Sequence, residues 1–198
     1  MIASRAQGGF FDTQVFAGIL ALFITVSAVM GIIDIKRKQI DQHRKWMMRA
    51  WVHAASIIAL RFVLLAAVQV IRRLRGFYVQ LPCEQLKFLE GNVTMYPQCT
   101  TGGARTAVEA NLFTKVRPEE AAAAFQLPFG MAGVIAFTIH ALLIEVYFHL
   151  TAAESERLRN VSYDRQLQCG YKHPGSGGLT SDRLGDTPRW KPTTTVSK

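Results

Sequence analysis

The sequence predicts an all-α fold, a polytopic helical membrane bundle of three spans with a lumenal loop, a possible disulfide and a disordered C-terminal tail. Two observations predict it. Of the 198 residues, 49% are apolar and 19% are charged, which excludes a chain that is disordered throughout. The charges flank long apolar stretches instead of forming one face, so the net charge of +9 indicates polar loops of a membrane protein and no nucleic-acid partner.

A short N-terminal segment, residues 1–12, precedes the first span. Residues 13–33 contain no charge between Asp12 and Asp34, and these 21 residues cover roughly 30 Å as a helix, the thickness of the hydrocarbon core of a bilayer. The apolar run is too long for a typical signal peptide, and no small-x-small cleavage site follows it. We therefore expect a retained membrane helix.

Two further apolar stretches predict the second and third spans. Residues 50–71 are interrupted by one charge, Arg61, and residues 127–153 by one acid, Glu145. Both stretches are apolar all round, whereas a core helix of a soluble protein usually has a polar face. The lipid bilayer is therefore the expected surrounding, in an endomembrane or the plasma membrane.

The connection between the first two spans sets the expected orientation. Residues 34–49 hold six basic residues against two acids, which favours the cytoplasmic side. The opposing signal is a cluster of three arginines just past the second span, at Arg72, Arg73 and Arg75. The loop that follows decides between the two orientations.

That loop, residues 72–126, carries two signals of an oxidising lumen. Cys83 and Cys99 flank a glycosylation sequon that begins at Asn92. A bridge between the two cysteines would constrain the loop by about 3 kcal/mol on a chain-entropy estimate. The alternative, two unpaired thiols and a chance sequon, stays open. With the loop in the lumen, the tail at residues 154–198 is cytoplasmic.

Local composition predicts order in the loop and disorder in the tail. Pro118 followed by two glutamates and four alanines is typical of a helix start, and Pro128 breaks or kinks that helix before the third span. The tail beyond Cys169 is rich in Gly, Ser, Thr and Pro, so we expect residues 154–198 to be largely disordered.

Charged groups at membrane depth are candidate functional residues. A central arginine costs about 2.5–3.5 kcal/mol on the translocon scale, and it normally faces the bundle interior and has a partner. If the second and third spans run antiparallel, Glu145 lies roughly 8 Å from the level of Arg61, within reach of a guanidinium. We therefore expect an Arg61–Glu145 ion pair with His140 one turn away. These three residues either line an intramembrane cavity, in which His140 and Glu145 act as acid and base, or only fix the register of the two helices.

Two histidines suggest another site. His53 is about 12 Å from the level of Arg61, and His149 is about 13 Å from that of His140, so both fall at nearly one depth. A pair of axial imidazoles from facing helices is what a haem iron requires, which makes haem b a possible cofactor. No spacing of Cys, His and carboxylates predicts a zinc site.

The start of the second span reads His43-Arg44-Lys45-Trp46-Met47-Met48-Arg49, with Arg61 after it. This His-x-x-Trp-Met-x-Arg run resembles a family of predicted multi-pass membrane proteins of unknown function in bacteria and fungi. The resemblance is specific over residues 43–61 and extends over residues 13–75, and past the lumenal loop it is limited to a loose similarity at Glu145. It implies membrane residence and a functional role for His43, Trp46, Arg49 and Arg61. It also implies a bundle of four or more spans, so one helix is missing here or is supplied by a partner.

The same run has a physical interpretation of its own. On a helix, His43, Trp46 and Met47 share one face, and Arg49 lies near the headgroup phosphates. The run is then either an interfacial anchor or a polar pocket at the cytoplasmic mouth of the bundle.

Three functions fit the sequence. The first is a membrane protein that binds or converts a lipid-soluble small molecule at Arg61, His140 and Glu145. The second is an electron carrier with haem between His53 and His149. The third is a non-catalytic accessory subunit of a membrane complex. The expected partners are another membrane protein or, in a homo-oligomer, further copies of this chain. No nucleotide loop, metalloprotease helix or nucleophile elbow is present, so whether the protein is an enzyme stays open.

Overall fold

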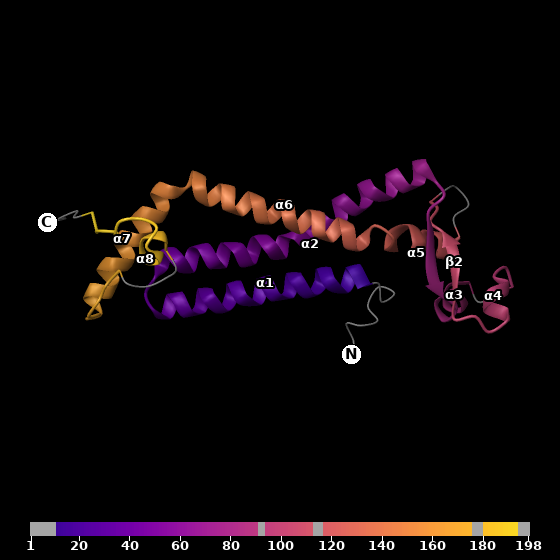
Figure 1. Ribbon diagram of the computed structural model, residues 1–198, viewed down its shortest axis with the longest axis horizontal. Helices are drawn as coiled ribbons and strands as arrows, with labels where there is room; N and C mark the ends of the chain where they lie inside the picture. Colours follow the sequence, from indigo (N-terminus) through magenta and orange to yellow (C-terminus); the bar gives the residue numbers. More distant parts are fainter. Residues whose placement is uncertain (1–10, 91–93, 113–116, 176–179, 194–198) are drawn as a thin grey trace. The chain divides into compact units, whose positions relative to one another are not determined.

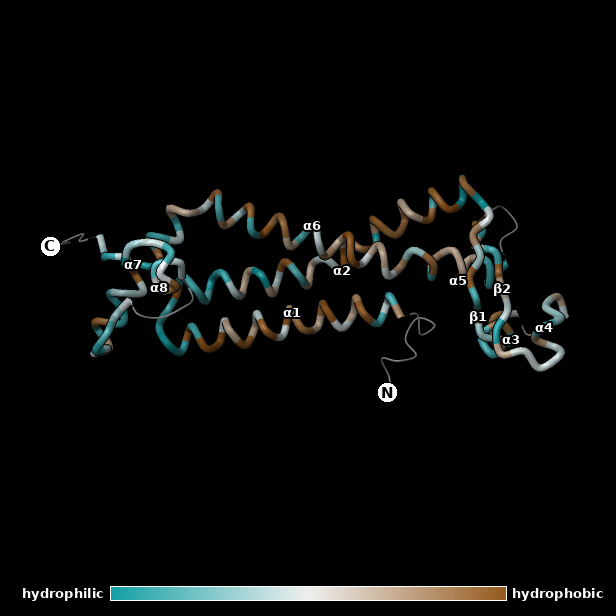
Figure 2. Tube along the Cα trace, in the orientation of Figure 1, coloured by the Kyte–Doolittle hydropathy of each residue, from teal (hydrophilic) through white to brown (hydrophobic). Residues whose placement is uncertain are grey.

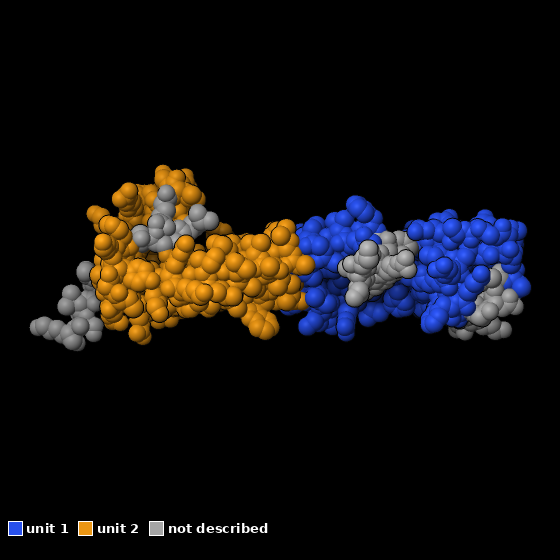
Figure 3. All heavy atoms as spheres, turned by 90° about the horizontal axis from the view of Figure 1, so that it is seen from below, with its two compact units in different colours: residues 1–20, 55–139 blue, residues 21–54, 140–198 orange. Residues whose placement is uncertain are grey.

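The computed structural model describes residues 11–90, 94–112, 117–175 and 180–193 (Figure 1). The chain divides into two compact units, which have different colours in Figure 3. Each unit is discontinuous in sequence, because each of the three long helices contributes residues to both. Unit 1 consists of residues 1–20 and 55–139, and unit 2 of residues 21–54 and 140–198.

Three long helices contain most of the apolar residues. They are α1 (Phe11–Lys36), α2 (Ile40–Leu74) and α6 (Phe129–Leu150). Each is long and apolar enough to cross a membrane, the third when counted with the short helix before it, from Pro118 to Leu150. Figure 2 shows apolar residues through the middle of each helix. The prediction of three spans is therefore confirmed, and the chain is an integral multi-pass membrane protein by this criterion.

The connection between α1 and α2 is shorter than residues 34–49 suggest. Only Arg37, Lys38 and Gln39 lie outside the two helices. Lys38 has a φ of 58°, a left-handed conformation that lets the chain reverse in so few residues. Residues 40–49 contain no glycine or proline, so nothing in the sequence stops α2 at the expected membrane boundary.

The loop between α2 and α6 contains a small sheet, so the prediction of a purely helical protein is wrong in this segment. Strand β1 (Tyr78–Pro82) pairs antiparallel with β2 (Arg105–Glu109), with Val79 opposite Val108 and Leu81 opposite Thr106. Buried and exposed residues alternate along both strands. This period of two is the strand signal that the sequence analysis missed in two five-residue segments.

Three short helices pack against this sheet in unit 1. They are α3 (Cys83–Glu90), α4 (Pro97–Thr100) and α5 (Pro118–Gln126). Side chains from these elements form a small apolar core, in which Leu81, Leu86 and Ala123 are fully buried.

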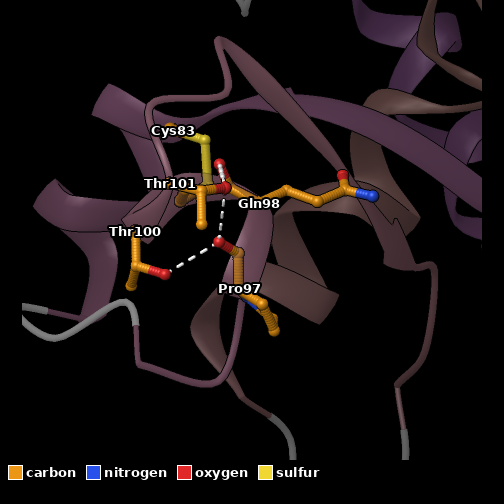
Figure 4. Close-up of a disulfide and its surroundings, with 6 residues drawn as sticks. Cys83, Pro97, Gln98, Thr100 and Thr101 are labelled. Atoms are coloured by element: carbon orange, nitrogen blue, oxygen red, sulfur yellow. Dashed lines mark hydrogen bonds between the residues drawn. A yellow bond between two sulfur atoms is a disulfide. The ribbon is translucent and has the colours of Figure 1, made fainter.

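A disulfide joins Cys83 at the start of α3 to Cys99 in α4, which confirms the predicted bridge (Figure 4). The carbonyl oxygen of Pro97 accepts hydrogen bonds from the hydroxyls of Thr100 and Thr101, at 2.7 and 3.0 Å, and so closes the turn beside the bridge. The predicted glycosylation residue Asn92 lies outside the described residues.

The predicted helix start at Pro118 is confirmed, since α5 begins at this residue. Arg117 before it is extended, as the residue preceding a proline prefers. Glu119 in the first turn is fully buried and accepts a hydrogen bond of 3.0 Å from the Tyr96 hydroxyl. Leu127 and Pro128 then separate α5 from α6, as the break expected at Pro128 requires.

The expectation of a largely disordered tail at 154–198 is wrong over most of its described part. Helix α7 (Ala152–Gln168) follows α6 after one residue, and α8 (Ser181–Leu184) forms a further turn. Residues 152–168 are rich in helix formers, and Glu154 and Arg157 pair across one turn at 2.7 Å. The helix also has tertiary contacts in unit 2, which composition does not reveal.

Candidate functional site

The candidate site lies within unit 2 and starts at the turn between α1 and α2. Asp34 in the last turn of α1 is only 2% exposed. The His43 ring nitrogen Nδ1 lies 2.8 Å from the carbonyl oxygen of Gly31. A carbonyl oxygen only accepts, so Nδ1 carries the proton in this contact. His43 of the predicted motif therefore ties α2 to α1.

Arg49 connects α2 to α6. Its guanidinium donates two hydrogen bonds to the carboxylate of Glu145, from Nε at 2.7 Å and from Nη2 at 3.0 Å. The guanidinium also lies over the rings of Trp46 and Phe148, at 5.1 and 5.0 Å from their centroids. A two-pronged ion pair with flanking aromatic rings holds an arginine in one orientation.

This geometry corrects the predicted Arg61–Glu145 pair. Both oxygens of Glu145 bind Arg49, twelve residues before Arg61 in the sequence. The prediction aligned the midpoints of apolar stretches, but α2 begins at Ile40, which moves a different arginine to the level of Glu145. Arg61 is exposed on the part of α2 that belongs to unit 1.

A second contact follows the same α2–α6 seam. Arg44 donates a hydrogen bond of 2.8 Å to the Tyr147 hydroxyl and lies 5.7 Å from the centroid of that ring. Tyr147 was not among the site residues predicted from the sequence. Tyrosine is common at the headgroup level of a membrane, so the position of Tyr147 near the end of the third span could have marked it as an interfacial residue.

The histidines proposed as haem ligands both belong to unit 2. His53 is buried, with its ring edge-on to Phe23 at 5.7 Å, while His149 is exposed on α6. His140, the third predicted histidine, is half-buried on α6. Haem ligation by His53 and His149 stays a prediction. Across the ranges that the structure describes, no group of three or more His, Cys, Asp or Glu is arranged to hold a metal ion.

Helix α7 packs against the turn between α1 and α2. The Ser162 hydroxyl accepts a hydrogen bond of 2.9 Å from the backbone N–H of Ile40, and its own proton lies between two acceptors, the Leu158 carbonyl oxygen at 2.8 Å and Asp41 at 3.2 Å. Gln166 donates from Nε2 to the carbonyl oxygen of Arg37 at 2.9 Å. These contacts satisfy backbone groups at the start of α2 and just past the end of α1, which explains why a polar helix is ordered here.

The segment after α7 returns to the same helix. Arg159 forms a 2.8 Å ion pair with Asp182 and lies 4.6 Å from the ring centroid of Trp190. Burial alone would raise the pKa of Asp182, but hydrogen bonds from Thr180, Arg159 and the Trp190 backbone outweigh it and lower the pKa to about 2. Asp182 is therefore ionised at neutral pH and fixes residues 180–190 on α7.

These elements line an open cavity of about 490 Å³, here named the basic cavity. Helices α1 and α2 and the turn between them supply most of its wall, and α7 and the returning segment complete it. Four lining residues are basic and one is acidic. The lining residues are Met30, Asp34, Arg37, Gln42, Lys45, Trp46, Arg49, Arg159, Thr180 and Ser181.

The cavity brings together part of the predicted motif and omits the predicted catalytic cluster. Trp46 and Arg49 line it, and Glu145 orients Arg49 through the ion pair. Arg37, Lys45 and Arg159 were not predicted as site residues. The sequence does show many basic residues next to the membrane spans, but basic residues on the cytoplasmic side of a membrane are expected without any binding site.

Comparison with known proteins adds no relative: no family model, no curated protein and no solved structure matches this chain. The resemblance carried by the His-x-x-Trp-Met-x-Arg run therefore stays a prediction.

Proposed function

We propose that this membrane protein binds an amphiphilic molecule by an anionic head in the basic cavity. The observation that supports this most directly is the charge of the lining, with Arg37, Lys45, Arg49 and Arg159 against the single acid Asp34. Cations held close together in a concave site repel one another unless an anion neutralises them. Arg49 and Arg159 form ion pairs with Glu145 and Asp182, which leaves Arg37 and Lys45 without an ion pair among the described residues, although the charge of Arg37 also acts on Asp34.

The size and composition of the cavity suit a small organic ligand. Its volume of about 490 Å³ falls within the range of roughly 300–1,000 Å³ that is usual for ligand pockets. Trp46 adds an aromatic surface, and the hydroxyls of Thr180 and Ser181 add hydrogen-bonding groups. A phosphate head suits this set, because guanidinium, ammonium and hydroxyl groups all donate hydrogen bonds to its oxygens.

The surroundings of the cavity favour a ligand that comes from the bilayer. The cavity is lined by residues at the connected ends of α1 and α2. Figure 2 shows that both helices are polar at these ends and apolar beyond them. A lipid could place its head among the basic residues and leave its chains beside the apolar helix surfaces. This extends the sequence-based hypothesis of a lipid-soluble ligand and moves its site from Arg61 and His140 to the basic cavity.

Binding is better supported than conversion of the ligand. Glu145, proposed from the sequence as a proton donor or acceptor, uses both oxygens to hold Arg49 and does not line the cavity. We therefore assign Glu145 a positioning role, with Arg49 contacting the ligand.

The proposal is tested with the full chain purified in a neutral detergent and titrated with phosphatidylglycerol, followed by native mass spectrometry. We expect Lys45→Ala and Arg37→Ala each to weaken binding about fivefold, since a basic residue near an anionic lipid contributes about 1 kcal/mol. Arg157→Ala removes a basic residue that lies outside the cavity lining, on the exposed surface of α7, and serves as the charge-matched control. Equal binding by all three variants would contradict the proposal.

A further inference from the structure

Asp34 is the one acid in the lining of the basic cavity, and its environment is unusual for a carboxylate. Its side chain is 2% exposed. The oxygen Oδ2 is buried, and the described residues supply it with no hydrogen-bond partner. None of the ion pairs found among those residues includes Asp34.

A buried carboxylate without a partner is costly. Removing an ionised acid from water costs several kcal/mol or more unless a cation or a hydrogen-bond donor pairs with it. The other acids near the cavity have such partners, since Glu145 binds Arg49 and Asp182 binds Arg159. Asp34 lies in the wall of the cavity, where Arg37 and His43 act on its charge but no described residue donates a hydrogen bond to Oδ2, which points to a donor on the ligand.

Resting on the proposed function, we infer that the ligand head carries a primary ammonium group beside its phosphate, as in an ethanolamine or serine phospholipid. The phosphate meets Arg37 and Lys45, and the ammonium donates to Oδ2 of Asp34. Cationic and acidic groups in one cavity match a zwitterionic head, in which both charges are separated by a short linker.

The structure favours a primary ammonium over the quaternary ammonium of choline. A trimethylammonium group has no N–H to donate, so it would leave Oδ2 of Asp34 without a hydrogen bond. Choline is instead recognised by the faces of aromatic rings. Trp46 is the aromatic residue in the lining, and the guanidinium of Arg49 already lies over its ring at 5.1 Å.

The test uses the full chain in neutral detergent and compares three lipids with identical acyl chains, namely phosphatidylethanolamine, phosphatidylcholine and phosphatidylglycerol. Competition between them is followed by native mass spectrometry. We expect wild-type protein to prefer phosphatidylethanolamine about tenfold over each of the others. In Asp34→Asn, which keeps the shape and removes the charge, we expect this preference to fall below twofold while phosphatidylglycerol still binds. Asp164→Asn changes an exposed acid of α7 and is the matched control.

Ligand variation keeps the test valid if Asp34→Asn does not fold. Stepwise N-methylation of phosphatidylethanolamine removes N–H donors from the ligand, and wild-type affinity is expected to fall with the second and third methyl groups. Competition by water-soluble O-phosphoethanolamine tests whether the head group is bound as part of a lipid or as a free phosphate ester. Weak competition by it supports a lipid, whereas competition at equal affinity assigns the same site to a free phosphate ester.

The outcomes separate this inference from the proposed function. If phosphatidylglycerol binding depends on Arg37 and Lys45 but all three lipids bind equally, the inference about Asp34 is overturned and the proposed function stands. If no lipid responds to Arg37→Ala or Lys45→Ala, both are overturned.

Discussion

Arg49 and Glu145 form a two-pronged ion pair between α2 and α6, with N–O distances of 2.7 and 3.0 Å. The pair replaces the Arg61–Glu145 interaction that the depths of the apolar stretches suggested. It also joins two features that the sequence presents separately, the Trp-Met-x-Arg run and a lone acid in the third span.

A double-mutant cycle on this pair is expected to show a coupling free energy of about 1 kcal/mol, because half of the Glu145 side chain is exposed. The variants are Arg49→Gln, Glu145→Gln and the double variant, measured by thermal unfolding in detergent. The cycle of Arg61→Gln with Glu145→Gln is the comparison. Larger coupling in that second cycle would restore the original prediction.

The disulfide is expected to stabilise the folded segment between α2 and α6. The two cysteines are 16 residues apart, and a loop of this size gives about 3 kcal/mol on a chain-entropy estimate. Cys99→Ser should therefore make residues 72–126 sensitive to pulse proteolysis at lower urea concentration. Cys169→Ser changes the exposed free thiol and should have no effect. Equal sensitivity of the two variants would refute this role.

Attachment of the C-terminal segment is expected to depend on the charge of Asp182. Its pKa is about 2 in the folded protein against an ordinary value of 3.8, so protonation favours the detached state. Attachment is complete above the ordinary pKa and is lost as the pH falls through about 2. The ¹⁹F resonance of 5-fluorotryptophan at Trp190 measures this attachment. The variant Trp190→Phe identifies that resonance by removing it.

In Asp182→Asn, the same resonance should indicate detachment at neutral pH and should no longer titrate. Asp164→Asn, which alters an exposed acid on α7, should behave like the wild type. An unchanged titration in Asp182→Asn would assign the transition to another group.

Helix α7 is expected to depend on Ser162, which is 4% exposed. Ser162→Ala removes the acceptor of the Ile40 N–H and a donor to Asp41, which should cost about 1–3 kcal/mol. Hydrogen exchange in α7 should accelerate accordingly. Ser155→Ala loses only a hydrogen bond within one turn, to Thr151, and should exchange at the wild-type rate. Similar acceleration in both variants would contradict the tertiary role of Ser162.

Two glycines of unit 1 are expected to respond oppositely to alanine. A Cβ atom at Gly133 would lie 2.7–2.8 Å from ring atoms of Phe16, and such overpacking typically costs about 1–3 kcal/mol. At Gly18 nothing lies within 4 Å, so Gly18→Ala should stabilise α1 by up to about 1 kcal/mol through helix propensity. Thermal unfolding of the two variants measures this difference, and a stabilising Gly133→Ala would show that Phe16 moves freely.

Much of the fold follows from local properties of the sequence. Three apolar runs of membrane length dictate three long helices, because a helix satisfies its own backbone hydrogen bonds and needs only apolar surroundings. Pro118 determines the start of α5 in the same local way, and the bridge predicted between Cys83 and Cys99 is present. The sheet was predictable in principle, but the alternation in β1 and β2 covers five residues each and is too short to stand out.

The candidate site depended on tertiary structure. Which arginine meets Glu145 is a question of register between α2 and α6, and register follows from packing and not from the limits of an apolar run. The order of α7 likewise rests on Ser162 and Gln166 meeting the α1–α2 turn from more than 120 residues away. The sequence by itself determined the membrane spans, since hydropathy is a property of each segment alone. Only the folded chain brought Asp34, Lys45 and Arg159 to one cavity, because residues distant in sequence become neighbours solely through folding.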